Sequence, residues 1–227
     1  MCRELSIHLT TAFSGSFEWF AKEIRLEQFP ELYDEAEMLY ESARHSLMPQ
    51  SIHTQAFIDS YRINDTGIPS VEIDGITFTG KILNRLHKVH RVFPYIATCG
   101  IGLEDIDPST RDFLVPYWID ILKSKALRIA QLQLETYLTE NYHLHRINSL
   151  NPGSGNVDIW PIEEMPKVFT LLHGGKAVGV KLTDSCLMIP NKTISGLFFA
   201  QDRIYESCTY CTRKNCPDRR TPFEQKL

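Results

Sequence analysis

Residues 181–199 read KLTDSCLMIPNKTISGLFF, and this stretch decides the fold class of the chain. Apolar and β-branched residues over 177–182, 185–189 and 193–199 predict two or three short strands. Turn residues (Pro190, Asn191 and Lys192) separate the last two of these strands. Strands that follow one another, after helices rather than between them, are typical of an α+β fold.

The residues before this stretch predict one hairpin, one further strand and several helices. Polar and apolar residues alternate over 70–79 on both sides of Asp74-Gly75, which predicts a hairpin. Residues 91–98 read RVFPYIAT and predict a strand that Pro94 would place at a sheet edge or a bulge. Apolar residues at helical spacing predict four helices, beginning at Pro30, Lys81, Pro116 and Pro161 and ending near Leu47, His90, Tyr142 and Leu172.

This order predicts a single α+β domain over residues 1–205, with a twisted, largely antiparallel sheet flanked by helices. A cysteine-rich tail over 206–227 follows it. No Gly-x-Gly-x-x-Gly follows a first strand, and neither a phosphate loop nor a Gly-x-Ser-x-Gly elbow occurs. The sequence therefore argues against Rossmann-type dehydrogenases, kinases and hydrolases.

Composition excludes further classes of protein. Of the 227 residues, 43% are hydrophobic and 23% are charged, which is typical of a globular domain rather than a disordered chain. The net charge of −4 lacks the basic excess of a nucleic-acid-binding protein. No segment approaches the ~18 apolar residues of a membrane span, and the N-terminus does not read as a signal peptide. We expect a soluble cytoplasmic protein that contacts neither nucleic acid nor membrane.

Three of the six cysteines lie in the last twenty residues, and they indicate a metal site. Cys208 and Cys211 have the two-residue spacing that lets two thiolates bind one metal from a tight turn, and Cys216 follows before a proline. Nearby arginines and lysines would offset the negative charge of a metal–thiolate cluster. An iron–sulfur cluster is favoured over zinc, with Cys99 as the fourth ligand by elimination. The alternative is a flexible tail with free thiols.

Pro152, Gly153, Ser154 and Gly155 form a second candidate site. These residues carry little side-chain bulk, so such a loop can press its backbone groups against a ligand. The alternative is an ordinary connection between two elements.

Three ordered segments resemble the activation (reactivation) domain of cobalamin-dependent methionine synthase. The segment 181–199 is similar to its closing strands, with a Lys-Leu-Thr-Asp-Ser stretch, then Met188, Pro190, Ser195, Gly196 and Phe198. Residues 98–104 are similar to a family segment before its long helix, and the Pro152-Gly153 loop with its following helix also matches. The resemblance covers roughly residues 70–200. The cysteine-rich tail resembles that of short, free-standing members.

The resemblance implies an accessory protein that reactivates a cobalamin-dependent methyltransferase, most simply methionine synthase. Such a domain binds S-adenosylmethionine and docks on a corrinoid-binding module. An external electron donor reduces cob(II)alamin, and S-adenosylmethionine then methylates it. The cobalamin belongs to the partner, and the domain supplies positioning. The chain would thus be a component of a methyltransferase and would carry no catalytic residue of its own.

The resemblance also implies the ligand-binding residues. The family loop reads Arg-x-x-x-Gly-Tyr; here Gly153 is kept, Ser149 replaces the arginine and Ser154 replaces the tyrosine. A late family tyrosine that faces the ligand corresponds to Phe198. The expected binding residues are therefore Ser149, Pro152, Gly153, Ser154, Gly155 and Phe198. Two alternatives stay open: an iron–sulfur protein that donates electrons to an oxidised corrinoid, and a non-catalytic, zinc-stabilised docking module for a corrinoid protein.

Overall fold

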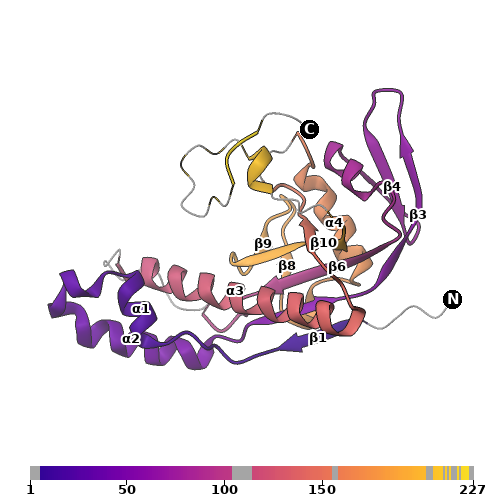
Figure 1. The fold of residues 1–227 in the computed structure, drawn as a ribbon. Helices are drawn as coiled ribbons and strands as arrows, with labels where there is room; N and C mark the ends of the chain where they lie inside the picture. The colour runs from indigo at the N-terminus through magenta and orange to yellow at the C-terminus, as the bar shows by residue number, and fades with distance from the viewer. Residues whose placement is uncertain are drawn as a thin grey trace.

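The computed structural model describes residues 6–103, 114–154, 158–202, 207–211, 213, 215, 219 and 221–224. Over these residues the chain forms an antiparallel sheet of eight strands and a separate two-stranded ribbon (Figure 1). The sheet strands are β1 (Ile7–Thr10), β2 (Gln50–His53), β3 (Ala56–Ile63), β4 (Pro69–Ile73), β5 (Ile76–Thr79), β6 (Arg91–Thr98), β7 (Ile147–Leu150) and β10 (Thr193–Ala200). The ribbon pairs β8 (Lys181–Leu182) with β9 (Met188–Ile189).

The strand β6 lies at the centre of the sheet. On one side it pairs with β10, which pairs in turn with β7. On the other side it pairs with β2 over residues 95–98 and with β3 over residues 91–92. The outer strands continue from β2 to β1 and from β3 through β4 to β5. The α+β class and the antiparallel sheet predicted from the sequence are thus confirmed.

The prediction that Pro94 marks an edge or a bulge is wrong. Pro94 faces Leu197 in the regular β6–β10 register, so it lies inside the sheet. Its carbonyl accepts a hydrogen bond from the Thr54 N–H (3.2 Å), in the short link between β2 and β3. A proline is tolerated here because the neighbouring strand changes from β2 to β3 at this point, where no ladder bond from residue 94 is needed.

Four α-helices accompany the sheet in the described residues: α1 (Phe17–Glu23), α2 (Tyr33–Ser46), α3 (Leu114–Tyr142) and α4 (Met165–Leu171). Two predicted helices are shorter and partly tighter than expected. Residues 81–90 contain only the 3₁₀ helix η3 (Lys81–Leu86), and α4 is preceded by η4 (Ile162–Glu164). The remaining 3₁₀ turns are η1 (Leu26–Gln28), η2 (Pro30–Leu32), η5 (Lys176–Val178) and η6 (Ser207–Tyr210).

The long helix α3 covers one face of the sheet, and α4 with η3 covers the other. Buried residues recur along α3 at steps of three and four, which gives a continuous apolar stripe: Trp118, Ile119, Leu122, Ala126, Ala130, Leu134 and Leu138. The second half of this stripe packs on Phe93, Tyr95 and Phe198. On the opposite face, Leu150, Ile96 and Leu197 pack with α4 in the largest core cluster.

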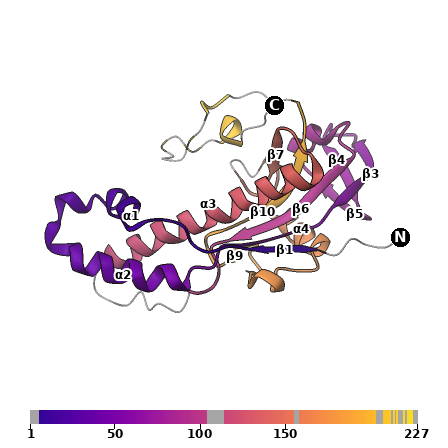
Figure 2. The ribbon, with the colours of Figure 1, turned by 60° about the horizontal axis from the view of Figure 1, so that its bottom comes forward.

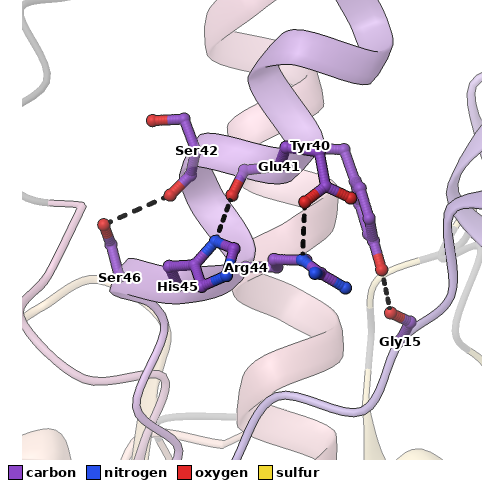
Figure 3. Close-up of polar contacts among 7 residues, drawn as sticks. All are labelled: Gly15, Tyr40, Glu41, Ser42, Arg44, His45 and Ser46. Atoms are coloured by element: carbon purple, nitrogen blue, oxygen red, sulfur yellow. Dashed lines mark hydrogen bonds and ion pairs between the residues drawn. The ribbon is translucent and has the colours of Figure 1, made fainter.

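The first half of α3 packs against α1 and α2 instead, at one end of the molecule (Figures 1 and 2). Ser16 caps α1, because its Oγ accepts a hydrogen bond from the Trp19 N–H (3.2 Å). The Tyr40 hydroxyl of α2 donates to the Gly15 carbonyl (2.6 Å), as Figure 3 shows. The segment before α1 is thereby tied to α2. No helix in the described residues is long and apolar enough to cross a membrane.

Candidate functional site

Strand pairing brings two of the predicted binding residues together. Ser149 of β7 lies opposite Phe198 of β10, and Phe198 lies opposite Phe93 of β6. Directly opposed residues point to the same face of a sheet, so Ser149 and Phe198 share the face covered by α3. Phe198 is 3% exposed and Ser149 is half-buried, so Phe198 is a core residue at the inner edge of the site.

Asn151, which follows β7 directly, is the centre of a polar network. Its Nδ2 donates to the Tyr95 hydroxyl (2.7 Å) and to the Ser195 carbonyl (2.9 Å). Its Oδ1 accepts a hydrogen bond from the Ser149 Oγ (3.2 Å). The amide of Asn151 thus links three strands, β6, β7 and β10, at the point where the predicted loop begins.

The loop itself is held by backbone hydrogen bonds. The Gly153 N–H donates to the Trp160 carbonyl (2.9 Å), and the Ser154 N–H donates to the Asn151 carbonyl (3.1 Å). Gly153 has φ +74°, and a Cβ there would lie 2.9 Å from the Ile162 Cβ, so both conformation and space favour glycine. Pro152 is buried and Ser154 is exposed, whereas Gly155 lies outside the described residues.

Gly196 makes the close approach of β10 to this loop possible. A Cβ at this position would collide with the Leu150 carbonyl and would lie 2.6 Å from the Asn151 Nδ2. Both residues of the Ser195-Gly196 pair therefore contribute to the position of the loop. The Ser195 carbonyl accepts a hydrogen bond from Asn151, and Gly196 leaves room for the Asn151 side chain.

Two titratable side chains near the site differ in their surroundings. Arg146, close to the loop in sequence, donates from Nη1 to the Asp202 carbonyl (2.8 Å). His53, opposite Tyr95 in the β2–β6 ladder, is fully buried beside the rings of Tyr137 and Tyr142. Burial lowers the pKa of His53 to about 4, so it is neutral at neutral pH.

The predicted metal ligands are not brought together with Cys99. Cys99 is fully buried among α1, α2 and α3, and its Sγ contacts the Gly100 carbonyl (3.3 Å). Tyr210, between Cys208 and Cys211, belongs to the largest core cluster, which also contains residues of η3 and α4. Among the described residues no three histidine, cysteine or acidic side chains gather as a metal site. Cys216 lies outside those residues.

Two surface hollows flank the segment that follows β1, and neither contains the predicted loop. One, of about 530 Å³, lies between residues 10–13 and the end of α2. The other, of about 460 Å³, lies between Leu9, Thr11, Ser14 and one face of α3. Both lie away from Asn151, so they are separate from the candidate site.

Sequence reasoning missed Asn151 and Tyr95. Asn151 stands before Pro152-Gly153, where an asparagine reads as ordinary turn chemistry. Tyr95 reads as one more apolar residue of a buried strand. The signal that links them is the pairing of β6 with β10, which local sequence does not contain.

The fold and loop define an α+β domain with a glycine-containing turn directly after strand β7, which pairs with β10. Residues 130–220 match the family model for the vitamin B12 dependent methionine synthase, activation domain. A crystal structure of the MetH reactivation domain bound to AdoHcy is similar, with a TM-score of 0.56 and 14% sequence identity. That match covers 90% of this chain and 81% of that chain. No curated protein sequence matches the chain. The resemblance to the activation-domain family is thereby confirmed.

Proposed function

We propose that the chain binds S-adenosylmethionine at the loop after β7 and presents its methyl group to the corrinoid of a cobalamin-dependent methyltransferase. The observation that carries this proposal is the family match over 130–220, because that segment includes the loop, β10 and, of the polar network, Ser149, Asn151 and Ser195. The AdoHcy bound to the similar crystal structure supports the class of ligand. The chain would act as a separate reactivating subunit.

The proposed reaction needs a partner and an electron. A one-electron donor reduces cob(II)alamin on the partner to cob(I)alamin. The cobalt then attacks the methyl carbon, the carbon–sulfur bond of the sulfonium breaks, and its electron pair stays on sulfur. The products are methylcobalamin and S-adenosylhomocysteine. The chain contributes position rather than acid–base chemistry, because holding the two reactants in line removes much of the entropic barrier.

The residues present fit a neutral, backbone-lined binding site. Asn151 fixes the start of the loop, and Pro152 and Gly153 set its path through contacts with Trp160 and Ile162. Ser154 is exposed and Ser149 is half-buried, so both hydroxyls can meet a polar ligand. The Tyr95 and Phe198 rings close the floor beneath the loop.

The affinity should be lower than that of a family member with the loop arginine. Ser149 cannot form the paired hydrogen bonds of a guanidinium with the ligand carboxylate, and Arg146 is committed to the Asp202 carbonyl. The loss of a charge-assisted pair weakens binding by about 1.5–3 kcal/mol, or roughly 10- to 160-fold. We therefore expect measurable but modest binding by the isolated chain.

Calorimetric titration of S-adenosylmethionine into the anaerobically purified chain tests the proposal. Ser149→Arg should tighten binding by roughly 10-fold or more by restoring the carboxylate partner. Ser42→Arg adds the same charge at an exposed position on α2 and should leave the affinity unchanged. Absence of binding at millimolar ligand to both the native chain and Ser149→Arg would overturn the proposal.

A second experiment tests the role in reactivation. Cob(II)alamin bound to its methyltransferase is reduced with a low-potential donor, with S-adenosylmethionine present, and S-adenosylhomocysteine is measured. The chain should accelerate its formation, and Ser149→Arg should lower the ligand concentration needed. Equal rates with and without the chain would contradict the proposed presentation.

A further inference from the structure

The orientation of one side-chain amide, that of Asn151, decides what the candidate site can offer a ligand. The Asn151 Nδ2 lies 2.9 Å from the Ser195 carbonyl and 2.7 Å from the Tyr95 hydroxyl. A main-chain carbonyl can only accept a hydrogen bond, so the amide nitrogen must face Ser195 and the amide oxygen must face away from it. Strand β10 therefore fixes the orientation of the Asn151 amide.

The Asn151 amide in turn fixes the hydroxyl of Ser149. The Asn151 Oδ1 carries no hydrogen, and the Ser149 Oγ lies 3.2 Å from it, so Ser149 supplies the proton of this hydrogen bond. A serine hydroxyl has a single hydrogen and two lone pairs. With its hydrogen directed to Asn151, Ser149 can accept a hydrogen bond from a ligand but cannot donate one.

Ser149 lies where a ligand can reach it. Among the described residues β7 pairs only with β10, so Ser149 belongs to an edge strand of that part of the sheet. Its side is half-buried, whereas Phe198, opposite to it in the register, belongs to the core beneath α3. Ser149 thus lies at the margin of this core, two residues before the loop that Asn151 begins.

The strands around Ser149 offer a ligand carboxylate no charged partner. Residues 147–154 and 193–200, which form β7, the described part of its loop and β10, contain no charged residue, and residues 130–142 of α3 contain no lysine or arginine. Two arginines border these strands, and both donate to main-chain carbonyls: Arg146 to Asp202 (2.8 Å) and Arg91 to Tyr142 (3.4 Å). A carboxylate placed at Ser149 would lose water without gaining a donor there, which is unfavourable.

From this geometry we infer that the site recognises its ligand through an ammonium group rather than a carboxylate, with Ser149 as the binding residue and Asn151 as the residue that positions its hydroxyl. An ammonium group is a donor only, so it matches the Ser149 oxygen. The inference rests on the proposed binding of S-adenosylmethionine and narrows the ligand class. The site should accept adenosyl sulfonium compounds that carry an amine, whether or not they carry a carboxylate.

Two analogues of S-adenosylmethionine test the inference by calorimetric titration into the native chain at pH 7. The decarboxylated analogue keeps the amine, and the deaminated analogue keeps the carboxylate. The decarboxylated analogue should bind roughly 10-fold more tightly than the deaminated one, or better, because it alone can donate to Ser149. Equal affinities, or tighter binding of the deaminated analogue, would overturn the inference.

Variants of Ser149 separate this contact from general attraction between a chain of net charge −4 and a cationic ligand. Ser149→Ala leaves the net charge unchanged and should reduce the preference for the decarboxylated analogue by roughly 10-fold. Ser149→Arg, which can only donate, should reverse the preference. Ser42→Ala removes an exposed hydroxyl from α2 and should keep it. An unchanged preference in Ser149→Ala would contradict the role of its hydroxyl.

Asn151→Ala tests the positioning role. Without the Asn151 Oδ1, the Ser149 hydrogen is free to turn toward a carboxylate, so the preference for the decarboxylated analogue should shrink. A loop that is merely loosened would weaken both analogues equally and keep their ratio, and that result would refute the positioning role. Circular dichroism checks that each variant is folded.

The same titrations distinguish failure of this inference from failure of the proposed function. If S-adenosylmethionine binds but the native chain does not discriminate between the two analogues, the inference is wrong and the proposed function stands. If none of the three ligands binds to the native chain or to Ser149→Arg, both are wrong.

Discussion

Tyr95 and Phe198 lie face to face on adjacent strands, with ring centroids 4.0 Å apart and an angle of 19° between their planes. The same Tyr95 accepts a hydrogen bond from Asn151 through its hydroxyl. The stacked pair therefore connects the core beneath α3 to the polar start of the β7 loop. The hydroxyl of Tyr95 contacts the loop, whereas the ring of Phe198 provides only packing.

Tyr95→Phe should loosen this loop while the ring stays packed. The Asn151 Nδ2 would lose one acceptor at a half-buried position, which costs about 1–2 kcal/mol of folding stability. Urea denaturation measures this loss, and S-adenosylmethionine affinity should fall with it. Tyr117→Phe, which removes a hydroxyl from a tyrosine that is 55% exposed on α3, is the control. If both variants reduced stability and affinity equally, the hydrogen bond of Tyr95 would not be what holds the loop.

Gly196→Ala should be among the most damaging single-methyl changes in the protein. The new methyl group would meet the Leu150 carbonyl and the Asn151 amide, both held in place by the sheet, so we expect a loss of about 3 kcal/mol. Gly67→Ala is the comparison: it has open space but φ +76°, so it should cost only about 1 kcal/mol of conformational strain. Thermal denaturation distinguishes them; similar melting temperatures would contradict the close approach of β10.

His53 should make folding stability fall in mild acid. Its pKa is lowered by burial from 6.5 to about 4, so the unfolded chain binds a proton that the folded chain excludes. Stability is full above pH 6.5 and declines as the pH falls toward 4, by up to about 3 kcal/mol. His53→Leu should flatten the decline between pH 6.5 and 5, measured by urea midpoints. His8→Gln, at an exposed histidine, should leave the profile as it is.

Tyr210→Phe should release the tail without unfolding the domain. The change removes the acceptor for Arg85 Nη2 but keeps the buried ring, so global stability should drop by about 1 kcal/mol or less. Limited trypsin digestion, read by mass spectrometry, should cleave after Arg213 faster than in the native chain. Tyr33→Phe, at a ring that is 47% exposed, should digest at the native rate. Native cleavage in Tyr210→Phe would show that other contacts hold the turn.

The elements that sequence predicted well carry strong local signals. Asp74-Gly75 specifies the β4–β5 hairpin, and the periodic stripe of α3 specifies the long helix. The strands β1, β2 and β3 have no comparable signal, because they depend on pairing with other strands: β1 with β2, β2 with β6, and β3 with β6 and β4. The prediction of a sheet edge or bulge at Pro94 was wrong for the same reason. The surroundings of Pro94 depend on where β2 ends and β3 begins, which is a long-range property.

In the candidate site, too, local sequence indicates some residues, and long-range strand pairing determines the others. Gly153 and Ser149 could be placed by motif, but the Asn151 network requires β6, β7 and β10 to be adjacent. The two-residue spacing identified the turn of Cys208 and Cys211, whereas Arg219 could be linked to it only through its hydrogen bonds in the folded tail. Cys99 was chosen by counting cysteines, and its burial among the N-terminal helices separates it from the tail.

The helix α3 contributes to two apolar clusters, one with α1 and α2 and one with β6 and β10. Cleavage of the chain within this helix would therefore expose apolar residues of both clusters at once. The helical end and the sheet cannot be expressed as independent halves, and heat or denaturant should unfold them in one cooperative step. If a partner bound α1 and α2, it would also fix the orientation of the sheet, because α3 packs against both parts and joins them into one rigid body.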